Sequence, residues 1–173
     1  MLVIMAGLPG AGKSTLARAV AARLNGVVLD KDPLRAALFP PAEIEYSAGQ
    51  DDFCMELMLQ TAAYLWTKNR QHVILLDGRT FSREYQIRRA IEFARAHGQE
   101  WRIVECVCSE ETARARLERD IREGQHPAAN RDWSLYQRVK AASDQILLPK
   151  IVIDTDLAVD EGVARAVASI APA

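Results

Sequence analysis

The sequence has few of the features that stabilise secreted or membrane proteins. It contains only three cysteines, an odd number without C-x-x-C spacing, which argues against a disulfide framework and against a zinc site. No apolar run approaches the roughly 20 residues that cross a bilayer. No basic segment precedes the first apolar run, as a signal peptide would require. The sequence therefore predicts a cytoplasmic protein without a membrane partner.

An excess of charge of one sign is also missing. The chain of 173 residues has 22 lysines and arginines against 23 acidic residues, a formal net charge of −1. This balance differs from the basic footprint of a nucleic-acid coat, although it is compatible with a local basic cleft. No repeat or low-complexity linker divides the chain, and its length fits a single domain over residues 1–173.

Strand-like and helix-like segments alternate along the chain. The strand-like segments are continuously apolar, which is typical of strands buried on both faces. They cover residues 2–6, 27–30, 72–77, 101–107 and 150–154. Helices are expected over 14–24, 32–38, 51–70, 82–96 and 160–170, and after Ser109, with a loop over 39–49. We expect Asp32 to cap the second helix and Pro33 to begin it. This order predicts an α/β domain, a three-layer sandwich around a five-stranded parallel sheet.

A glycine-rich segment, GLPGAGKST, joins the first strand to the first helix. Residues 7–15 match G-x-x-x-x-G-K-[ST] in the strand–loop–helix context that this motif requires. Glycines let main-chain N–H groups turn toward an anion, and the helix adds the positive end of its dipole. The predicted nucleotide-binding residues are Gly7, Gly10, Ala11, Gly12, Lys13, Ser14 and Thr15. Lys13 is expected at the β- and γ-phosphates of ATP, Ser14 at Mg²⁺ and Thr15 at the α-phosphate.

Two classes of nucleotide-binding protein fit this sequence poorly. A GTPase would need an N-K-x-D motif, and the sequence contains none. A motor of the AAA type would end its third strand in an Asp-Glu pair, whereas this chain has Asp77-Gly78.

These motifs together resemble the P-loop small-molecule and polynucleotide kinases. The group includes gluconate kinase, shikimate kinase, chloramphenicol phosphotransferase and the polynucleotide 5′-kinase domain, and the resemblance covers nearly the whole chain. It implies a P-loop nucleoside-triphosphate hydrolase fold with sheet order 2-3-1-4-5 and a helical lid over about 113–138. It also implies an ATP- and Mg²⁺-dependent kinase that phosphorylates a hydroxyl of a small molecule.

The segment LDKDPLR, residues 29–35, resembles the part of these kinases that binds the phosphate acceptor. Asp32 and Arg35 match an Asp-x-x-Arg pattern. The resemblance implies that Asp32 accepts the proton of the attacking hydroxyl and that Arg35 clamps an anionic group. Asp30 is an alternative base or acceptor contact, because other members place the acid nearer the strand end.

The end of the third strand carries a second group of candidates. Asp77 follows buried apolar residues, where a carboxylate can hold Mg²⁺ beside Ser14. Polynucleotide kinases often read Asp-x-Thr-Asn from this point, but here the chain reads Asp77-Gly78-Arg79-Thr80. Arg79 is therefore a candidate contact to substrate or phosphate.

Residues 112–132 resemble the lid of these kinases. Its arginines recur every three residues on the expected helix, and Arg119 is the one expected to contact ATP and the transferring phosphoryl group. Arg116, Arg122 and Arg131 are the reserve candidates. Interleaved acids also make this stretch typical of a salt-bridged surface helix. Thr155, in the turn after the last strand, is expected near the adenine.

Three functions remain open from the sequence. The leading one is a small-molecule hydroxyl kinase. The second is a polynucleotide 5′-hydroxyl kinase, favoured by Asp32 and Arg35 but opposed by the net charge and by Arg79. The third is a nucleotide-binding regulatory protein with weak ATPase activity. The expected assembly is a monomer or a homodimer.

Overall fold

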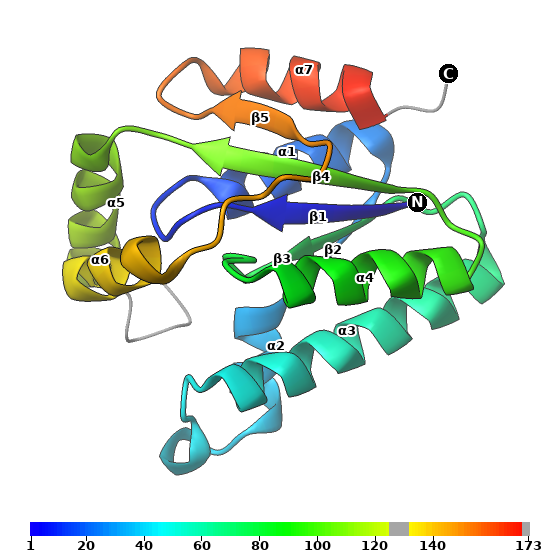
Figure 1. The fold of residues 1–173 in the computed structure, drawn as a ribbon, viewed down its shortest axis with the longest axis horizontal. Helices are drawn as coiled ribbons and strands as arrows, with labels where there is room; N and C mark the ends of the chain where they lie inside the picture. The colour runs from blue at the N-terminus through cyan, green and yellow to red at the C-terminus, as the bar shows by residue number, and fades with distance from the viewer. Residues whose placement is uncertain (125–131, 171–173) are drawn as a thin grey trace.

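A computed structural model of the protein describes residues 1–124 and 132–170. Its centre is one parallel sheet of five strands in the order β2-β3-β1-β4-β5, which confirms the predicted sheet (Figure 1). The strands are β1 (Leu2–Ala6), β2 (Val27–Asp30), β3 (Ile74–Asp77), β4 (Trp101–Val107) and β5 (Ile151–Asp154). β1 lies at the centre, with Leu2 in register with Ile74 of β3 and with Trp101 of β4.

Helices cover both faces of the sheet (Figure 1). On one face lie α1 (Lys13–Leu24) and α7 (Val159–Ile170), and on the other α3 (Ala48–Lys68) and α4 (Glu84–Ala96). Because successive side chains of a strand point to opposite faces, β1 supplies both layers. Leu2 and Ile4 pack in the cluster of α3 and α4, whereas Val3 and Met5 pack in that of α1 and α7. Burial on both faces explains why this strand is apolar at every position.

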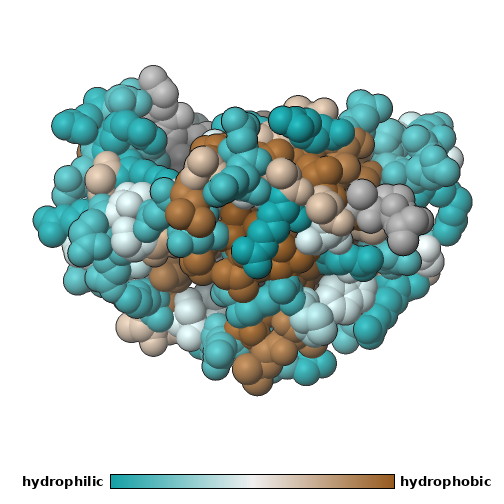
Figure 2. Space-filling model, turned by 90° about the horizontal axis from the view of Figure 1, so that it is seen from above, coloured by the Kyte–Doolittle hydropathy of each residue, from teal (hydrophilic) through white to brown (hydrophobic). Residues whose placement is uncertain are grey.

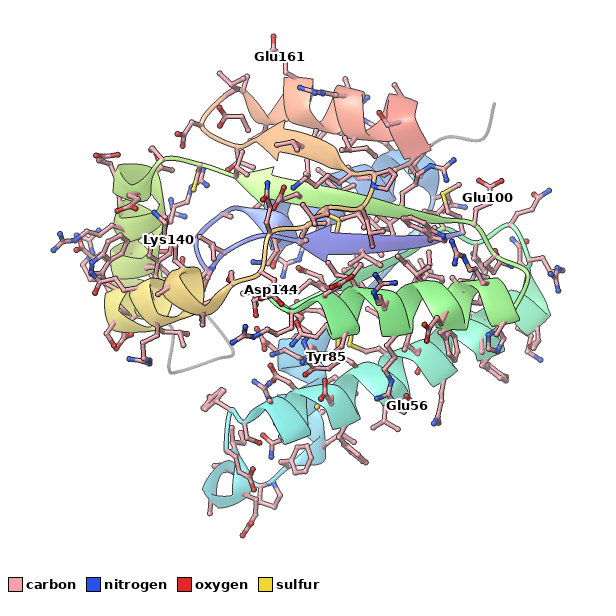
Figure 3. The ribbon with its side chains drawn as sticks, in the orientation of Figure 1. Glu56, Tyr85, Glu100, Lys140, Asp144 and Glu161 are labelled. Atoms are coloured by element: carbon pink, nitrogen blue, oxygen red, sulfur yellow. The ribbon has the colours of Figure 1, made fainter. Side chains whose placement is uncertain are left out.

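The remaining helices gather near the carboxyl ends of the strands. They are α2 (Lys31–Leu38), the short 3₁₀ turn η1 (Pro41–Glu43), α5 (Glu110–Glu123) and α6 (Trp133–Ala142). α5 and α6 stand beyond the ends of β1 and β4 and pack through Ala113, Leu117 and Tyr136 (Figure 1). The link from α6 to β5 is tied to α4, because Asp144 accepts hydrogen bonds from the Glu84 N–H and from Arg83, each at 3.2 Å (Figure 3).

Several predicted boundaries are wrong. α2 begins at Lys31, and its cap is Asp30, whose carboxylate accepts the Asp32 N–H at 3.1 Å. Asp32 therefore lies within the first turn rather than before it. The expected loop over 39–49 ends early, because Ser47 caps α3 by accepting the N–H of Gln50 at 3.1 Å. β3 begins at residue 74 instead of 72. The lid contains a second helix, α6, that the sequence patterns did not separate.

The outer surface is mixed in character. Figure 2 looks onto the side of α7 and β5, where apolar side chains gather in the middle of a hydrophilic surround. Exposed apolar residues of this region are Val152, Leu157 and Val159. Within residues 1–124 and 132–170, no helix has the length and apolarity needed to cross a membrane.

Candidate active site

Two cavities open near the carboxyl ends of the strands, and Lys13 and Ser14 line both. The first, of about 500 Å³, lies between the glycine-rich loop, α5 and the turn that joins β5 to α7. We call it the loop cavity. The second, of about 420 Å³, lies between α2, α3, the β3–α4 loop and α6. We call it the ion-pair cavity. Molecules bound in the two cavities would meet at Lys13 and Ser14.

The glycine-rich loop has a backbone that side chains would disrupt. Gly7 has φ +136° and Gly10 has φ +78°, conformations that L-residues rarely adopt. A Cβ on Gly7 would lie 2.4 Å from the carbonyl oxygen of Cys106, and one on Gly10 would lie 2.8 Å from that of Ala113. The loop is thus packed between β4 and α5, so glycine is required for contact as well as for conformation.

Lys13 places a positive charge against this loop. Its side chain is buried, and Nζ donates to the carbonyl oxygens of Gly7 at 2.8 Å and Leu8 at 2.9 Å. Lys13 is also the first residue of α1, whose first turn holds no acidic residue. The ammonium group and the positive end of the helix dipole therefore act together on any anion bound there. Ser14 and Thr15, in the same turn, line the loop cavity.

The loop cavity also has an arginine anchored to its wall. Arg116 Nη1 donates to the carbonyl of Gly10 at 3.1 Å and to Thr155 Oγ1 at 2.9 Å, and Nη2 donates to the Thr155 carbonyl at 2.7 Å. Thr155 Oγ1 also donates to the carbonyl of Ala11 at 3.1 Å. These contacts join α5, β5 and the loop. Arg119, one turn further on, lines the same cavity.

The other predicted loop residues have different positions. Gly12 lines the loop cavity, whereas Gly7 and Ala11 line a third cavity of about 310 Å³ behind the loop, between β4 and α6. Figure 3 shows Lys140 on this side, where it pairs with Glu110 of α5. Of the reserve arginines, Arg122 is exposed on α5. Arg131 lies outside the described residues.

An apolar wall faces the polar loop across the loop cavity. Leu157 and Val159 line it, with 59% and 53% of their surfaces exposed. Apolar walls with a few converging polar groups are typical of small-ligand sites, and a flat ring can cover such exposed surface.

A buried carboxylate lies at the end of β3. Asp77 is fully buried, and within the described residues neither of its oxygens has a hydrogen-bond partner. Asp30 is its register partner on β2 and lines the loop cavity. Burial and the nearby charge of Asp77 raise the pKa of Asp30. A buried carboxylate without a partner is costly, and a bound cation would relieve that cost.

Asp77 and Ser14 have the donor chemistry that Mg²⁺ takes. This ion binds one or two carboxylate or hydroxyl oxygens and completes its shell with water and nucleotide phosphates. In the described part of the chain, no group of three or more His, Cys, Asp or Glu residues could hold a metal ion by itself.

The ion-pair cavity is built from charged side chains of α2 and α3. Lys31 Nζ lies 2.7 Å from Asp51 Oδ1 and 3.3 Å from Asp32 Oδ1. Arg35 Nη1 lies 3.4 Å from Asp32 Oδ1, and its Nη2 pairs with Asp51. The guanidinium of Arg35 also stands over the ring of Tyr46, 5.0 Å from its centre. Burial lowers the pKa of Lys31 to about 8, against the opposing effect of Asp32.

Arg79 enters the same cavity from the β3–α4 loop. It is buried, and its Nη1 lies 2.6 Å from Asp52 Oδ1. Tyr85, at the start of α4, donates to the other oxygen of Asp52 at 3.2 Å (Figure 3). Asp52 thereby connects α3 to the loop that carries Arg79.

The structure thus brings Asp32, Arg35 and Arg79 into one cavity and places Asp30 at the other. Sequence reasoning missed Lys31, Asp51 and Asp52. Lys31 stands inside the segment 29–35 that was singled out, but a single lysine there has no distinctive spacing. The two acids lie near the start of α3, where acidic residues are common because they complement the helix dipole.

Comparison with known proteins bears on the family and the fold. The profile of a family described as an AAA domain matches residues 2–141. An APS kinase of Mycobacterium tuberculosis, solved with AMPPNP and APS, is 20% identical, covers 96% of this chain and 95% of its own, and has a TM-score of 0.67. A gluconokinase of Sinorhizobium meliloti is 17% identical, with coverages of 96% and 89% and a TM-score of 0.67.

A third structure is similar to the whole chain. Kti12 of Chaetomium thermophilum, solved with ADP-AlF3, is 13% identical, covers 99% of this chain and 100% of its own, and has a TM-score of 0.69. At these identities the likeness establishes the fold, and the predicted resemblance to P-loop kinases is confirmed. No curated protein matches the sequence.

Proposed function

We propose that this chain, which belongs to that AAA-domain family, is an ATP-dependent kinase that transfers the γ-phosphoryl group to a hydroxyl of a small molecule. The observation that carries the proposal is that two separate cavities share Lys13 and Ser14. A hydrolase needs room for one nucleotide and a water, whereas a kinase needs two adjoining sites. Phosphoryl transfer depends mainly on such positioning and on charge stabilisation.

The loop cavity is the proposed ATP site. The adenine would lie against the apolar wall near Thr155, and the phosphates would follow the loop to Lys13 and the first turn of α1. Mg²⁺, held by Ser14 and Asp77, would neutralise phosphate charge. Arg119 would contact the transferring phosphoryl group, while the anchored Arg116 would hold α5 against the loop. Nucleotide analogues in two of the similar structures support this assignment.

The ion-pair cavity is the proposed acceptor site. The acceptor hydroxyl oxygen would attack the γ-phosphorus, and the bond from that phosphorus to the β–γ bridging oxygen would break, which releases ADP. Asp32 would orient the hydroxyl and accept its proton. Lys31 and Arg35, which contact one oxygen of Asp32, would fix the position of its carboxylate.

Asp30 is the rival base. Its raised pKa suits a proton acceptor, but its place on the loop cavity and beside Asp77 supports a role near the phosphates instead. The two acids differ in which cavity they line, so separate variants can distinguish them.

The test is ADP release from Mg-ATP with a panel of acceptors: sugars, sugar acids, nucleosides, antibiotics and 5′-hydroxyl oligonucleotides. We expect one class to stimulate release well above the rate without acceptor. Asp32→Asn should abolish the stimulation, and Glu92→Gln, an exposed acid of α4, should leave it unchanged. If ADP formation stays at the basal rate with every class, the kinase proposal fails and a nucleotide-binding regulatory protein with weak ATPase activity becomes the better account.

A polynucleotide 5′-kinase remains the second candidate, because the Asp32 and Arg35 pair lines the proposed acceptor site. Such an enzyme would bind a 5′-hydroxyl oligonucleotide with an affinity that falls steeply as salt rises. Stimulation by oligonucleotides alone, with that salt dependence, would replace the small-molecule proposal.

A further inference from the structure

Three cationic side chains are buried around the ion-pair cavity. Lys31, Arg35 and Arg79 are 6%, 3% and 5% exposed. Buried cations are rare because desolvation is costly, and each needs a compensating partner. In this protein they come from α2 and from the β3–α4 loop, and all of them line the one cavity.

The acids that compensate these cations are more exposed than the cations. The side chains of Asp32, Asp51 and Asp52 are 12%, 23% and 32% exposed, against 7%, 3% and 5% for Lys31, Arg35 and Arg79. Water screens an exposed charge more than a buried one. The pairs balance in number, the buried cations are their less screened members, and Lys13 brings a further positive charge to the cavity.

The same cations offer more hydrogen-bond donors than the protein accepts. A guanidinium has five N–H donors and an ammonium has three. Within the described residues, their partners include the three carboxylates and the Tyr85 hydroxyl, the latter at 3.5 Å from Arg79. Nε of Arg35 is buried, and within the described residues no group accepts a hydrogen bond from it. An added group that only accepts hydrogen bonds would fit this surplus of donors.

We propose that Arg79 and Lys31 form an anion subsite in the ion-pair cavity, so that the acceptor is a hydroxyl compound with a carboxylate, sulfate or phosphate group. The part that concerns the hydroxyl rests on the proposed kinase function, whereas anion binding does not. Arg79 makes the main contact to the anion. Asp52 and Tyr85 hold one edge of its guanidinium, and this leaves donors for a ligand in a fixed orientation. Lys31 supplies a second charge on the same cavity.

The first experiment measures anion binding without turnover. Isothermal titration with inorganic sulfate is done on the full chain saturated with Mg-AMPPNP, so that the glycine-rich loop is filled and does not compete. We expect one sulfate to bind, with the affinity reduced at least tenfold in Arg79→Gln and in Lys31→Met, because each loses a charge-assisted contact. Arg79→Lys, which keeps the charge but loses the oriented donors, should lower the affinity less than Arg79→Gln does. Arg88→Gln, which removes an exposed arginine of α4, should bind as the wild type does.

A second variant distinguishes the loss of the anion contact from the loss of the folded structure. Arg79→Gln leaves Asp52 without its cation, whereas the double variant Arg79→Gln/Asp52→Asn removes both charges of the pair. The double variant should melt cooperatively and still fail to bind sulfate. Sulfate binding that is absent in the wild type, or equal in the wild type, Arg79→Gln and Arg79→Gln/Asp52→Asn, would overturn the subsite.

The second experiment compares acceptors with and without the anionic group: gluconate with glucitol, glycerate with glycerol, and a nucleoside 3′-phosphate with its nucleoside. The subsite predicts at least tenfold higher kcat/KM for the charged member of the pair that is turned over, and a preference near one in Arg79→Gln. Turnover that prefers the neutral member would overturn the subsite and leave the kinase intact. Sulfate binding without any turnover would keep the subsite and count against the kinase.

Discussion

The loop cavity and the ion-pair cavity adjoin at Lys13 and Ser14, yet different parts of the chain form their walls. Within the glycine-rich segment, the loop cavity is lined by residues close together in the chain, from Gly10 to Thr15, and relies on main-chain conformation and a helix end. The ion-pair cavity relies on side chains that reach it from α2, α3, the β3–α4 loop and α6. A site of the first kind accommodates any molecule with the same phosphate chain. A site of the second kind can be altered one side chain at a time, so it is where specificity for an acceptor can arise.

The largest effect should follow from removing the residue that both cavities share. Lys13→Met should lower acceptor-stimulated ADP release by about 10³-fold, because the charge opposite the transferring phosphoryl group is lost. The check is the initial rate at saturating ATP, with Lys68→Met, an exposed lysine of α3, as control. A loss confined to KM for ATP would mean that Lys13 serves the loop cavity alone.

The next largest effect should come from a variant that alters one of the two cavities and leaves the other unchanged. Asp32→Asn should lower kcat by about 10²-fold or more while KM for ATP stays within a few-fold, because a base is removed from the acceptor side only. Asp30→Asn should instead change the dependence on ATP or on Mg²⁺. Steady-state kinetics with both substrates varied provide the measurement. If the two variants exchange these behaviours, Asp30 is the base.

A change in the free energy of unfolding should show that the glycine-rich loop depends on its backbone conformation. Gly7→Ala should lower the free energy of unfolding by about 2 kcal/mol, since the new Cβ would lie 2.4 Å from a main-chain oxygen of β4. Gly49→Ala in α3 is the matched control, because among the described residues its Cβ would meet only Ser47 Oγ, at 4.0 Å, and it should be neutral or slightly stabilising. Urea unfolding of both variants gives the values. Equal effects would contradict the tight packing of the loop.

The smallest effect concerns pH and belongs to the ion-pair cavity. The pKa of Lys31 is lowered from 10.5 to about 8, and its ammonium faces Asp32, Asp51, Arg35 and Arg79. Between these two pH values the unfolded chain keeps a proton that the folded chain has lost, so the free energy of unfolding rises with pH.

The Lys31 contribution should amount to at most about 1.4 kcal/mol per pH unit. Urea unfolding of the wild type and of Lys31→Met at pH 7.5 and 9.5 isolates it, because the other titrating groups largely cancel in the difference. The stability of the wild type relative to the variant should be greater at pH 9.5. A relative stability that falls with pH would contradict the burial of Lys31.

The loop and the central strands could be predicted because their causes are local. A strand buried on both faces is apolar at every position, as β1 is, and the conformation of the loop at Gly7 and Gly10 depends on residues next to each other. The start of α2 was misplaced because two acids, Asp30 and Asp32, can each cap a helix, and Pro33 is tolerated anywhere in the first turn. The extended backbone of Asp30, at φ −112° and ψ 122°, identifies Asp30 as the cap.

The ion-pair cavity could be predicted only in part. Asp32, Arg35 and Arg79 were found as separate candidates, but their convergence depends on how α3 packs against α2. Asp51 meets Lys31 and Arg35 only through that packing, and no spacing in the sequence encodes it. The contacts of Arg116 likewise depend on α5 reaching both the loop and Thr155.

The most direct test of the central claim follows the fate of the phosphoryl group. The protein is incubated with Mg²⁺ and γ-³²P-labelled ATP in the presence of the acceptor that stimulates ADP release, and the products are separated. Transfer between adjoining cavities predicts label in an organic phosphate ester, one for each ADP formed, with little inorganic phosphate. Label found only in inorganic phosphate would contradict the account, because the second cavity would then not hold the molecule that receives the phosphoryl group.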